Sequence, residues 1–286
     1  MLSRKEMRGR CPACGYPNAY TETTGKNGQR VGWCASCQDR KAIATILRGA
    51  GDPMPRAAGD DAYGPAETTR EAEKRKEQAR VIWNGATPVT SHDPAGLYLA
   101  WRGLSHLIGC PALRCRDDLR HPQESGRFHA LVAVVLDVSG ALVAVHRTYV
   151  AKDGRKARVE PIKARKGPVA GGAIRLGPVA RHIVIGEGIE SSASAGLLLG
   201  LPAWAAVSAG NMATGLILPP EVQEVTIAAD DDGVNAQGRN PGIEAAEAAA
   251  ARWQAEGRKV RIVKPNQPGR DFNDIFQARA AGVVAQ

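Results

Sequence analysis

The carboxyl-terminal third of the chain alternates short apolar runs with longer segments of helical periodicity. The apolar runs predict strands at residues 181–186, 203–207, 224–229 and 259–265. Helices are expected at residues 191–201 and 241–257, the second with Asn240 as its N-cap and Pro241 in its first turn. Short apolar strands separated by Ala-rich helices are typical of a parallel, Rossmann-like doubly wound sheet, so we expect an α/β domain here.

The middle of the chain mixes helical and strand periodicity. Residues 67–83 and 92–104 predict helices, and two apolar runs within residues 130–150 flank a turn-forming segment, which predicts a β-hairpin. Eight lysines and arginines fall between residues 147 and 166. A basic subdomain of mixed α+β structure is therefore expected, and a positively charged loop and strand of this kind suits phosphate groups better than a purely solubilising surface.

Four of the six cysteines form two CxxC pairs separated by 19 residues. These are Cys11, Cys14, Cys34 and Cys37. Each CxxC turn can direct two thiolates at one metal, so the spacing predicts a structural Zn²⁺ site in a small zinc ribbon, with a redox-active dithiol as the alternative. Cys110 and Cys115 lack this spacing and are expected to be buried thiols.

A segment rich in Gly, Pro and Asp separates the cysteine-containing part from the rest and predicts a linker. The expected domains are a zinc ribbon at residues 1–50, the linker at 51–66, the basic subdomain at 67–180 and the α/β domain at 181–286.

Composition and charge narrow the class of protein. The 286 residues are 43% hydrophobic, enough for a sizeable core. No apolar run reaches the roughly 18–20 residues of a membrane span, and MLSRKEMRGR contains no signal-peptide core, so we expect a protein of the bacterial cytoplasm without a membrane partner. The net charge of +9 divides into +12 on residues 1–180 and −3 on residues 181–286. This asymmetry favours a polyanion bound by the first part and metal ions by the second, the alternative being ordinary scatter of solvated charges.

Acidic residues follow three of the predicted strands. Glu187 follows the first, Asp230 and Asp232 follow the third, and Asp271 lies beyond the last. Because the carboxyl ends of parallel strands meet at one edge of a sheet, we expect these carboxylates to gather there. Gathered carboxylates repel unless a cation neutralises them, and hard oxygen ligands select Mg²⁺ or Mn²⁺. The pattern predicts metal-dependent phosphoryl transfer, although each residue taken alone also fits a helix cap or a solvated loop.

The acidic pattern resembles the Toprim domain. The matching segments are IGEGIE with Glu187, AADDDG with Asp230 and Asp232, and GRDFND with Asp271. Toprim domains are shared by DnaG-type primases, type IA and type II topoisomerases, RecR recombination proteins and some nucleases. The resemblance implies that Glu187, Asp230 and Asp232 are catalytic and that these three, together with Asp271, hold Mg²⁺.

The order of the parts is similar to that of DnaG-type primases of phages and mobile elements, in which a zinc ribbon, a linker and a basic subdomain precede the Toprim domain. The resemblance implies that the basic subdomain binds the template and the incoming nucleotide. The residues implied are Arg127, Arg147, Lys152, Arg155, Lys156, Arg158, Lys163, Lys166 and Arg175. The middle region is shorter than that of the cellular primases and diverges from it.

We therefore expect a DNA primase, a nucleotidyltransferase that acts as a DNA-directed RNA polymerase and makes short RNA primers. Its expected partners are single-stranded DNA, NTPs and a replicative helicase, and its expected cofactors are structural Zn²⁺ and catalytic Mg²⁺ or Mn²⁺. Two alternatives remain open at this point: a non-catalytic, RecR-like protein that binds DNA, and a Toprim nuclease.

Overall fold

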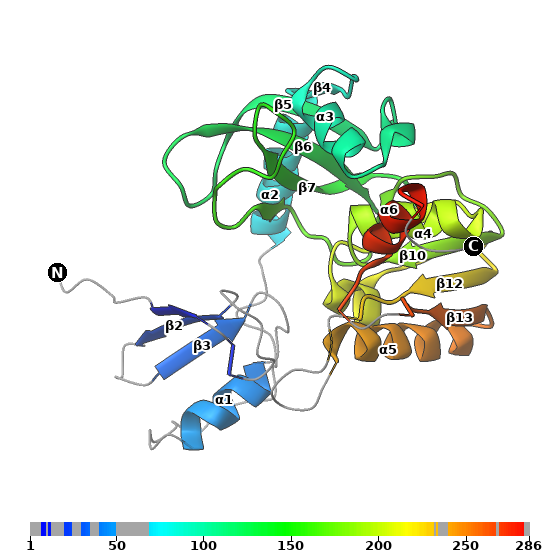
Figure 1. The fold of residues 1–286 in the computed structure, drawn as a ribbon. Coiled ribbons are helices and arrows are strands. Elements are labelled where there is room, and N and C mark those ends of the chain that lie inside the picture. Colours follow the sequence, from blue (N-terminus) through cyan, green and yellow to red (C-terminus); the bar gives the residue numbers. More distant parts are fainter. Residues whose placement is uncertain are drawn as a thin grey trace.

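The computed structural model describes residues 7–9, 11–12, 20–24, 30–34, 40–49, 69–231, 233, 240–266 and 269–282. These residues form a small N-terminal sheet followed by two five-stranded sheets (Figure 1). Among the described residues, none of the helices combines the length and the hydropathy that a membrane span requires.

The described N-terminal part is a three-stranded antiparallel sheet with one helix. Its elements are β1 (Met7–Gly9), β2 (Tyr20–Thr24), β3 (Arg30–Cys34) and α1 (Arg40–Gly49). β2 and β3 form an antiparallel hairpin in which Tyr20 pairs with Cys34. Cys11 and Cys34 are buried in one small cluster with apolar residues of β2 and α1, so two of the predicted zinc ligands share a core. Cys14 and Cys37 lie outside the described residues, and the zinc site stays a prediction.

The first five-stranded sheet is antiparallel and has the order β4-β5-β6-β7-β8. Its strands are β4 (Thr87–Pro88), β5 (Leu113–Arg120), β6 (Arg127–Leu136), β7 (Leu142–Val150) and β8 (Lys163–Lys166). Its helices are α2 (Thr69–Asn84), α3 (Pro94–Trp101) and the short 3₁₀ turn η1 (Ser105–Leu107). Both predicted helices and the predicted hairpin are confirmed, because β6 and β7 pair over the expected turn.

Successive residues of β6 and β7 face opposite sides of this sheet, as the pleat of a strand requires. Val132 and Val145 pack under α2. Leu131 and Ala144 pack on the other side, in a core shared with α3 and with residues of the second sheet. The first sheet therefore has one face toward α2 and one face toward the second sheet.

The second sheet has the order β13-β12-β10-β11-β9. Its strands are β9 (Ile174–Arg175), β10 (His182–Gly186), β11 (Ala203–Ala205), β12 (Glu224–Ala228) and β13 (Lys259–Val263). Four strands are parallel, which confirms the predicted sheet, and β9 adds an antiparallel edge strand that the apolar pattern does not predict.

Helices cover both faces of the second sheet (Figure 1). They are α4 (Ile189–Leu199), the short π turn η2 (Asn211–Gly215), α5 (Pro241–Ala255) and α6 (Phe272–Ala280). α4 packs with α6 on one face and α5 packs with η2 on the other, as a doubly wound sheet requires.

The two large sheets are tied together just before β9. Ala173 and Leu136 exchange two backbone hydrogen bonds of 2.9 Å, which attaches this segment to β6. Two residues later, Arg175 pairs with Trp204 of β11 in the second sheet. The chain is thus hydrogen-bonded to both sheets within three residues.

Candidate active site

Two of the predicted carboxylates lie at neighbouring strand ends. Glu187 directly follows β10, and Asp230 lies two positions after the end of β12. The two strands pair in parallel, with Gly186 opposite Ala228. The Ser191 hydroxyl donates a hydrogen bond of 2.5 Å to Asp230 Oδ1, which fixes this carboxylate against the start of α4. We call Glu187 and Asp230 the Toprim edge, after the domain that the motifs around them resemble. Their placement is the one that the parallel-sheet argument predicts.

The N-terminus of α5 lies tight against this edge. A Cβ on Gly242 would stand 2.3 Å from the carbonyl oxygen of Asp230, so a side chain there would force the helix and the strand end apart. Asn240, the N-cap of α5, donates from Nδ2 to Asp231 Oδ1 at 2.6 Å. The turn that carries Asp230 is therefore held from the helix side as well.

Asp271 caps α6. Its side chain accepts a hydrogen bond from the backbone N–H of Asp274 at 2.8 Å, and the Asp274 carboxylate accepts one from the backbone N–H of Asp271 at 3.3 Å, which makes a capping box. Arg102 Nη2 lies 3.9 Å from Asp271 Oδ2. Asp271 thus caps α6, in addition to the metal-binding role that the resemblance implies. The sequence pattern did not indicate Arg102 as its charged neighbour.

The donor set of the Toprim edge fits a hard divalent cation, because two carboxylates come from adjacent strands. Within the part of the chain that the structure describes, no three His, Cys, Asp or Glu side chains come together in a group that could hold a metal ion. Asp232, the third predicted ligand, follows β12 in the sequence and lies outside the described residues. The Mg²⁺ site stays a prediction.

A buried carboxylate of α4, on the second sheet, contacts the first sheet. Glu190 of α4 is 5% exposed, and it accepts hydrogen bonds from Tyr98 Oη of α3 at 2.5 Å and from Lys163 Nζ of β8 at 2.9 Å. Burial alone raises the pKa of Glu190, but Lys163 and Tyr98 outweigh it and hold this pKa well below its usual range. Glu190 is thus a buried anion with a matching cation from the other sheet.

The cations of β8 also face the Toprim edge. Burial lowers the pKa of Lys163, but Glu190 and, more weakly, Glu187 outweigh burial and raise it. Burial lowers the pKa of Arg165, and Glu187 partly offsets this. Both side chains therefore lie within the electrostatic reach of the Glu187 carboxylate, which places positive charge opposite the negative edge.

His146 of β7 lies beside these cations and was missed by sequence reasoning. It is 8% exposed, and its Nδ1 has no hydrogen-bond partner among the residues that the structure describes. Burial, together with the nearby charges of Lys163 and Arg165, lowers the pKa of His146 to about 3. The ring is therefore neutral at neutral pH.

Val207, directly after β11, has a φ of +73°. A β-branched residue in the left-handed region is strained by about 1–3 kcal/mol. Its backbone N–H donates to the carbonyl oxygen of Glu187 at 2.9 Å. The strained turn thus holds the backbone of the Toprim edge, and no local pattern in the sequence points to it.

The nine basic residues implied by the resemblance do not form one cluster. Lys163 and Lys156 lie on the Toprim side, since Lys156 is acted on by Glu190 and Asp271. Arg147 and Lys166 lie on the α2 side of the sheet, where they line a groove with residues of that helix.

The other implied residues have local partners or are exposed. Arg127 pairs with Asp118 at 2.9 Å, and Arg155 lies 5.9 Å from the ring centre of Trp101. Lys152 and Arg158 are exposed. Arg175 donates to the carbonyl oxygen of Asp137 at 2.6 Å and stacks on Trp204, so its contacts are those of a structural residue.

Cys115 is buried and Cys110 is partly buried, as predicted, and neither forms a disulfide with another described cysteine. Burial raises the pKa of Cys115 to about 12 and also raises that of Cys110. These thiols are packing residues.

Residues 182–282 match the family of the Toprim domain, so this part of the chain is a Toprim domain, as its motifs predict. Residues 73–176 match a domain of unknown function, DUF7146. None of the curated proteins matches the chain.

Three of the solved structures that match the chain are described as primases or primase fragments. The catalytic domain of DnaG primase bound to ssDNA is 15% identical with a TM-score of 0.48, and the match covers 74% of this chain and 79% of that one. The primase fragment of the bacteriophage T7 primase-helicase is 14% identical with a TM-score of 0.41, over 98% and 96% of the two chains. The E. coli primase catalytic core is 15% identical with a TM-score of 0.46, over 72% and 75%.

Proposed function

We propose that this protein is a DNA primase that synthesises short RNA primers on single-stranded DNA by metal-dependent nucleotidyl transfer. The observation that carries the proposal is the Toprim edge with Lys163 and Arg165 of β8 opposite Glu187. Carboxylates that can hold a metal, facing cations that can bind phosphates, suit a reaction at phosphorus.

In this proposal the 3′-hydroxyl of one ribonucleotide attacks the α-phosphate of the next NTP, and pyrophosphate leaves. Glu187, Asp230 and Asp232 would hold the metal ion, with Asp271 as a further ligand. Bound Mg²⁺ or Mn²⁺ supplies stabilisation of the charge on the attacking and leaving oxygens. Lys163 and Arg165 bind the triphosphate and neutralise the leaving pyrophosphate, and Glu190 orients the Lys163 ammonium group.

Three further parts of the proposal rest on the sequence pattern. Cys11, Cys14, Cys34 and Cys37 hold a structural Zn²⁺. The ribbon and the basic subdomain hold the DNA template. A replicative helicase is the expected partner in phage, plasmid or bacterial replication.

The test is primer synthesis by the full chain on libraries of single-stranded DNA with NTPs and either Mg²⁺ or Mn²⁺. We expect short oligoribonucleotides, and Glu187→Gln or Asp230→Asn should reduce their yield by at least about 10²-fold. Glu247→Gln, on the exposed face of α5, is the matched control and should leave the yield unchanged.

Two outcomes would replace the proposal. Loss of DNA ends with Mg²⁺ and without NTPs would make the protein a Toprim nuclease. DNA binding with no metal-dependent product would make it a non-catalytic binding protein.

A further inference from the structure

The first turn of α4 brings a hydroxyl group to one carboxylate of the Toprim edge. Ser191 is the third residue of α4 and is 4% exposed. Its Oγ donates a hydrogen bond of 2.5 Å to Asp230 Oδ1. A hydrogen bond to an ionised carboxylate is stronger than one between neutral groups, and it fixes the orientation of the acceptor. The Ser191 hydroxyl therefore restricts the rotation of the Asp230 carboxylate.

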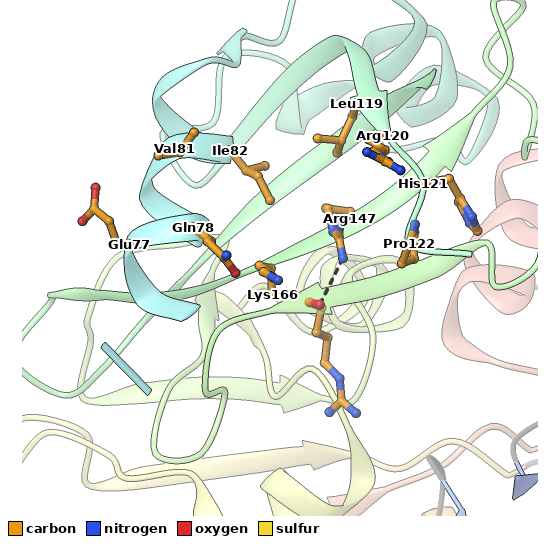
Figure 2. Close-up of a pocket in the computed structure, with 11 residues that line it drawn as sticks. Glu77, Gln78, Val81, Ile82, Leu119, Arg120, His121, Pro122, Arg147 and Lys166 are labelled. Carbon is orange, nitrogen blue, oxygen red and sulfur yellow. Dashed lines mark hydrogen bonds between the residues drawn. The ribbon is translucent and has the colours of Figure 1, made fainter. Parts of the chain in front are cut away.

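The residue before Ser191 anchors this turn of α4 to the first sheet. Glu190 is buried and accepts hydrogen bonds from Tyr98 of α3 and Lys163 of β8. Lys163 faces α4, whereas Lys166 of the same strand lines a groove of about 690 Å³ beside α2, on the other face of the sheet (Figure 2). The Ser191 hydroxyl thus belongs to a helix start that is held in place from the first sheet.

The backbone of Asp230 is held from the opposite side. A Cβ on Gly242 would lie 2.3 Å from the carbonyl oxygen of Asp230, so α5 packs directly on this turn. The next carboxylate, that of Asp231, accepts a hydrogen bond of 2.6 Å from Asn240 Nδ2. With its backbone fixed, Asp230 can still turn about its side-chain bonds, and this is the motion that the Ser191 hydroxyl restricts.

The other two serines of α4 have hydroxyl groups that serve the fold. Ser192 and Ser194 are both fully buried. Ser192 Oγ donates to the carbonyl oxygen of Gly188 at 2.6 Å, and Ser194 Oγ accepts from Asn273 Nδ2 at 2.9 Å. Ser191 differs from them because its hydroxyl reaches a predicted metal ligand. Its hydrogen bond is therefore directed at the Toprim edge and not at its own helix.

A carboxylate that is held at one oxygen suits a small divalent cation. Mg²⁺ requires a near-ideal octahedral arrangement and binds few protein ligands, whereas Ca²⁺ takes about six to eight oxygen ligands and often both oxygens of one carboxylate. Ser191 engages Oδ1 of Asp230 and limits its rotation. This arrangement favours ligation through one oxygen of Asp230 over chelation through both.

We infer that Ser191 is a positioning residue, which holds Asp230 for ligation through one oxygen and thereby favours Mg²⁺ or Mn²⁺ over Ca²⁺. Ser191 acts through Asp230 and is not itself a metal ligand. The inference rests on the metal-binding part of the proposed function and does not require polymerisation.

The test is metal binding by the full chain, without NTPs or DNA. Mn²⁺ is titrated into the protein in a buffer free of other divalent cations, and free Mn²⁺ is measured by electron paramagnetic resonance. Displacement of Mn²⁺ by Mg²⁺ and by Ca²⁺ then gives the dissociation constants of both ions. Asp230→Asn should weaken this binding, which assigns it to the Toprim edge.

Ser191→Ala should weaken Mg²⁺ binding about tenfold, as expected when the hydrogen-bond partner of a metal ligand is lost. Ca²⁺ binding should weaken by a smaller factor, because a carboxylate that is free to turn can offer both oxygens. The ratio of the two dissociation constants should therefore shift toward Ca²⁺. Ser192→Ala is the matched control, since it removes a buried hydroxyl from the next position of the same helix, and it should leave the ratio unchanged.

The possible failures are distinguishable. Equal Mg²⁺ affinities of Ser191→Ala and Ser192→Ala would overturn the inference, and so would equal losses of Mg²⁺ and Ca²⁺ affinity in Ser191→Ala. Metal binding that Asp230→Asn leaves unchanged would overturn both the inference and the metal ligands of the proposed function. The expected effect of Ser191→Ala in a protein that makes no primers would support the inference and overturn the primase.

Discussion

On the face of the first sheet that meets the Toprim domain, Lys163 donates to the buried carboxylate of Glu190. On the α2 face of the same sheet, the buried guanidinium of Arg147 donates to a phenol and a carbonyl oxygen. The two cations come from the neighbouring strands β8 and β7, and their side chains lie on opposite faces of the sheet. The comparison shows that Lys163 has a buried counter-charge within the fold, whereas the acceptors that the described residues offer to Arg147 are neutral.

Breaking the Lys163–Glu190 pair should have the largest effect on stability. Lys163→Met leaves the Glu190 carboxylate buried without a cation and should lower the free energy of unfolding by about 2 kcal/mol, less than a fully buried pair because Lys163 is partly exposed. Urea unfolding at pH 7 measures this. Lys152→Met, an exposed lysine, is the control and should change it by less than about 0.5 kcal/mol.

The double variant Lys163→Met with Glu190→Gln sharpens this result. It should recover part of the lost stability, because no unpaired charge remains. The pKa of Glu190 is lowered in the fold, so its contribution is present above the usual pKa of a glutamate and is lost as the pH falls below it. The difference between wild type and Lys163→Met should therefore shrink in acid, and a constant difference would contradict the pairing.

His146 should give a smaller effect that depends on pH. Its pKa is lowered from its usual value to about 3, so the unfolded chain binds a proton that the folded chain does not. Stability should fall as the pH drops below about 6.5, by up to about 1.4 kcal/mol per pH unit. Urea unfolding at pH 7, 6 and 5 should show a flatter profile for His146→Leu. The exposed His92 is the control, and His92→Leu should keep the profile of the wild type.

Val207 should give the smallest effect. Val207→Gly relieves the strain of a positive φ but loses apolar packing, so the free energy of unfolding should change by less than about 1 kcal/mol. Val184→Gly, at a fully buried position of β10 with ordinary backbone, should cost about 3 kcal/mol or more. Equal losses in thermal unfolding of the two variants would show that the turn after β11 is not strained.

Local sequence patterns were enough to predict the Toprim sheet. The apolar runs marked its parallel strands, and placing Glu187 and Asp230 at neighbouring strand ends required only that parallel strands point the same way. Helix α5 was equally visible, because Asn240 and Pro241 mark its start.

The arrangement of the basic residues could not be predicted as a single cluster. Residues 163–166 form a strand that pairs with β7, and their alternation sends Lys163 and Lys166 to opposite faces of the sheet. The basic stretch between residues 147 and 166 does not indicate which face each side chain takes, because lysines and arginines occupy both faces of the strands. Tyr98 and Glu190 meet across 92 positions of sequence, and no local pattern connects them.

The segment just before β9 bonds to one sheet through Ala173 and Leu136, and β9 itself bonds to the other through Arg175 and Trp204. This short connection disfavours a hinge motion between the two sheets. Moving the sheets apart would break the main-chain hydrogen bonds between this segment and one of them. The distance from β8 to the Toprim edge is thus set when the chain folds. A substrate would bind to a preformed site and not to one that closes around it. In the proposed primer synthesis, the growing strand would therefore move along this edge while the two sheets keep their spacing.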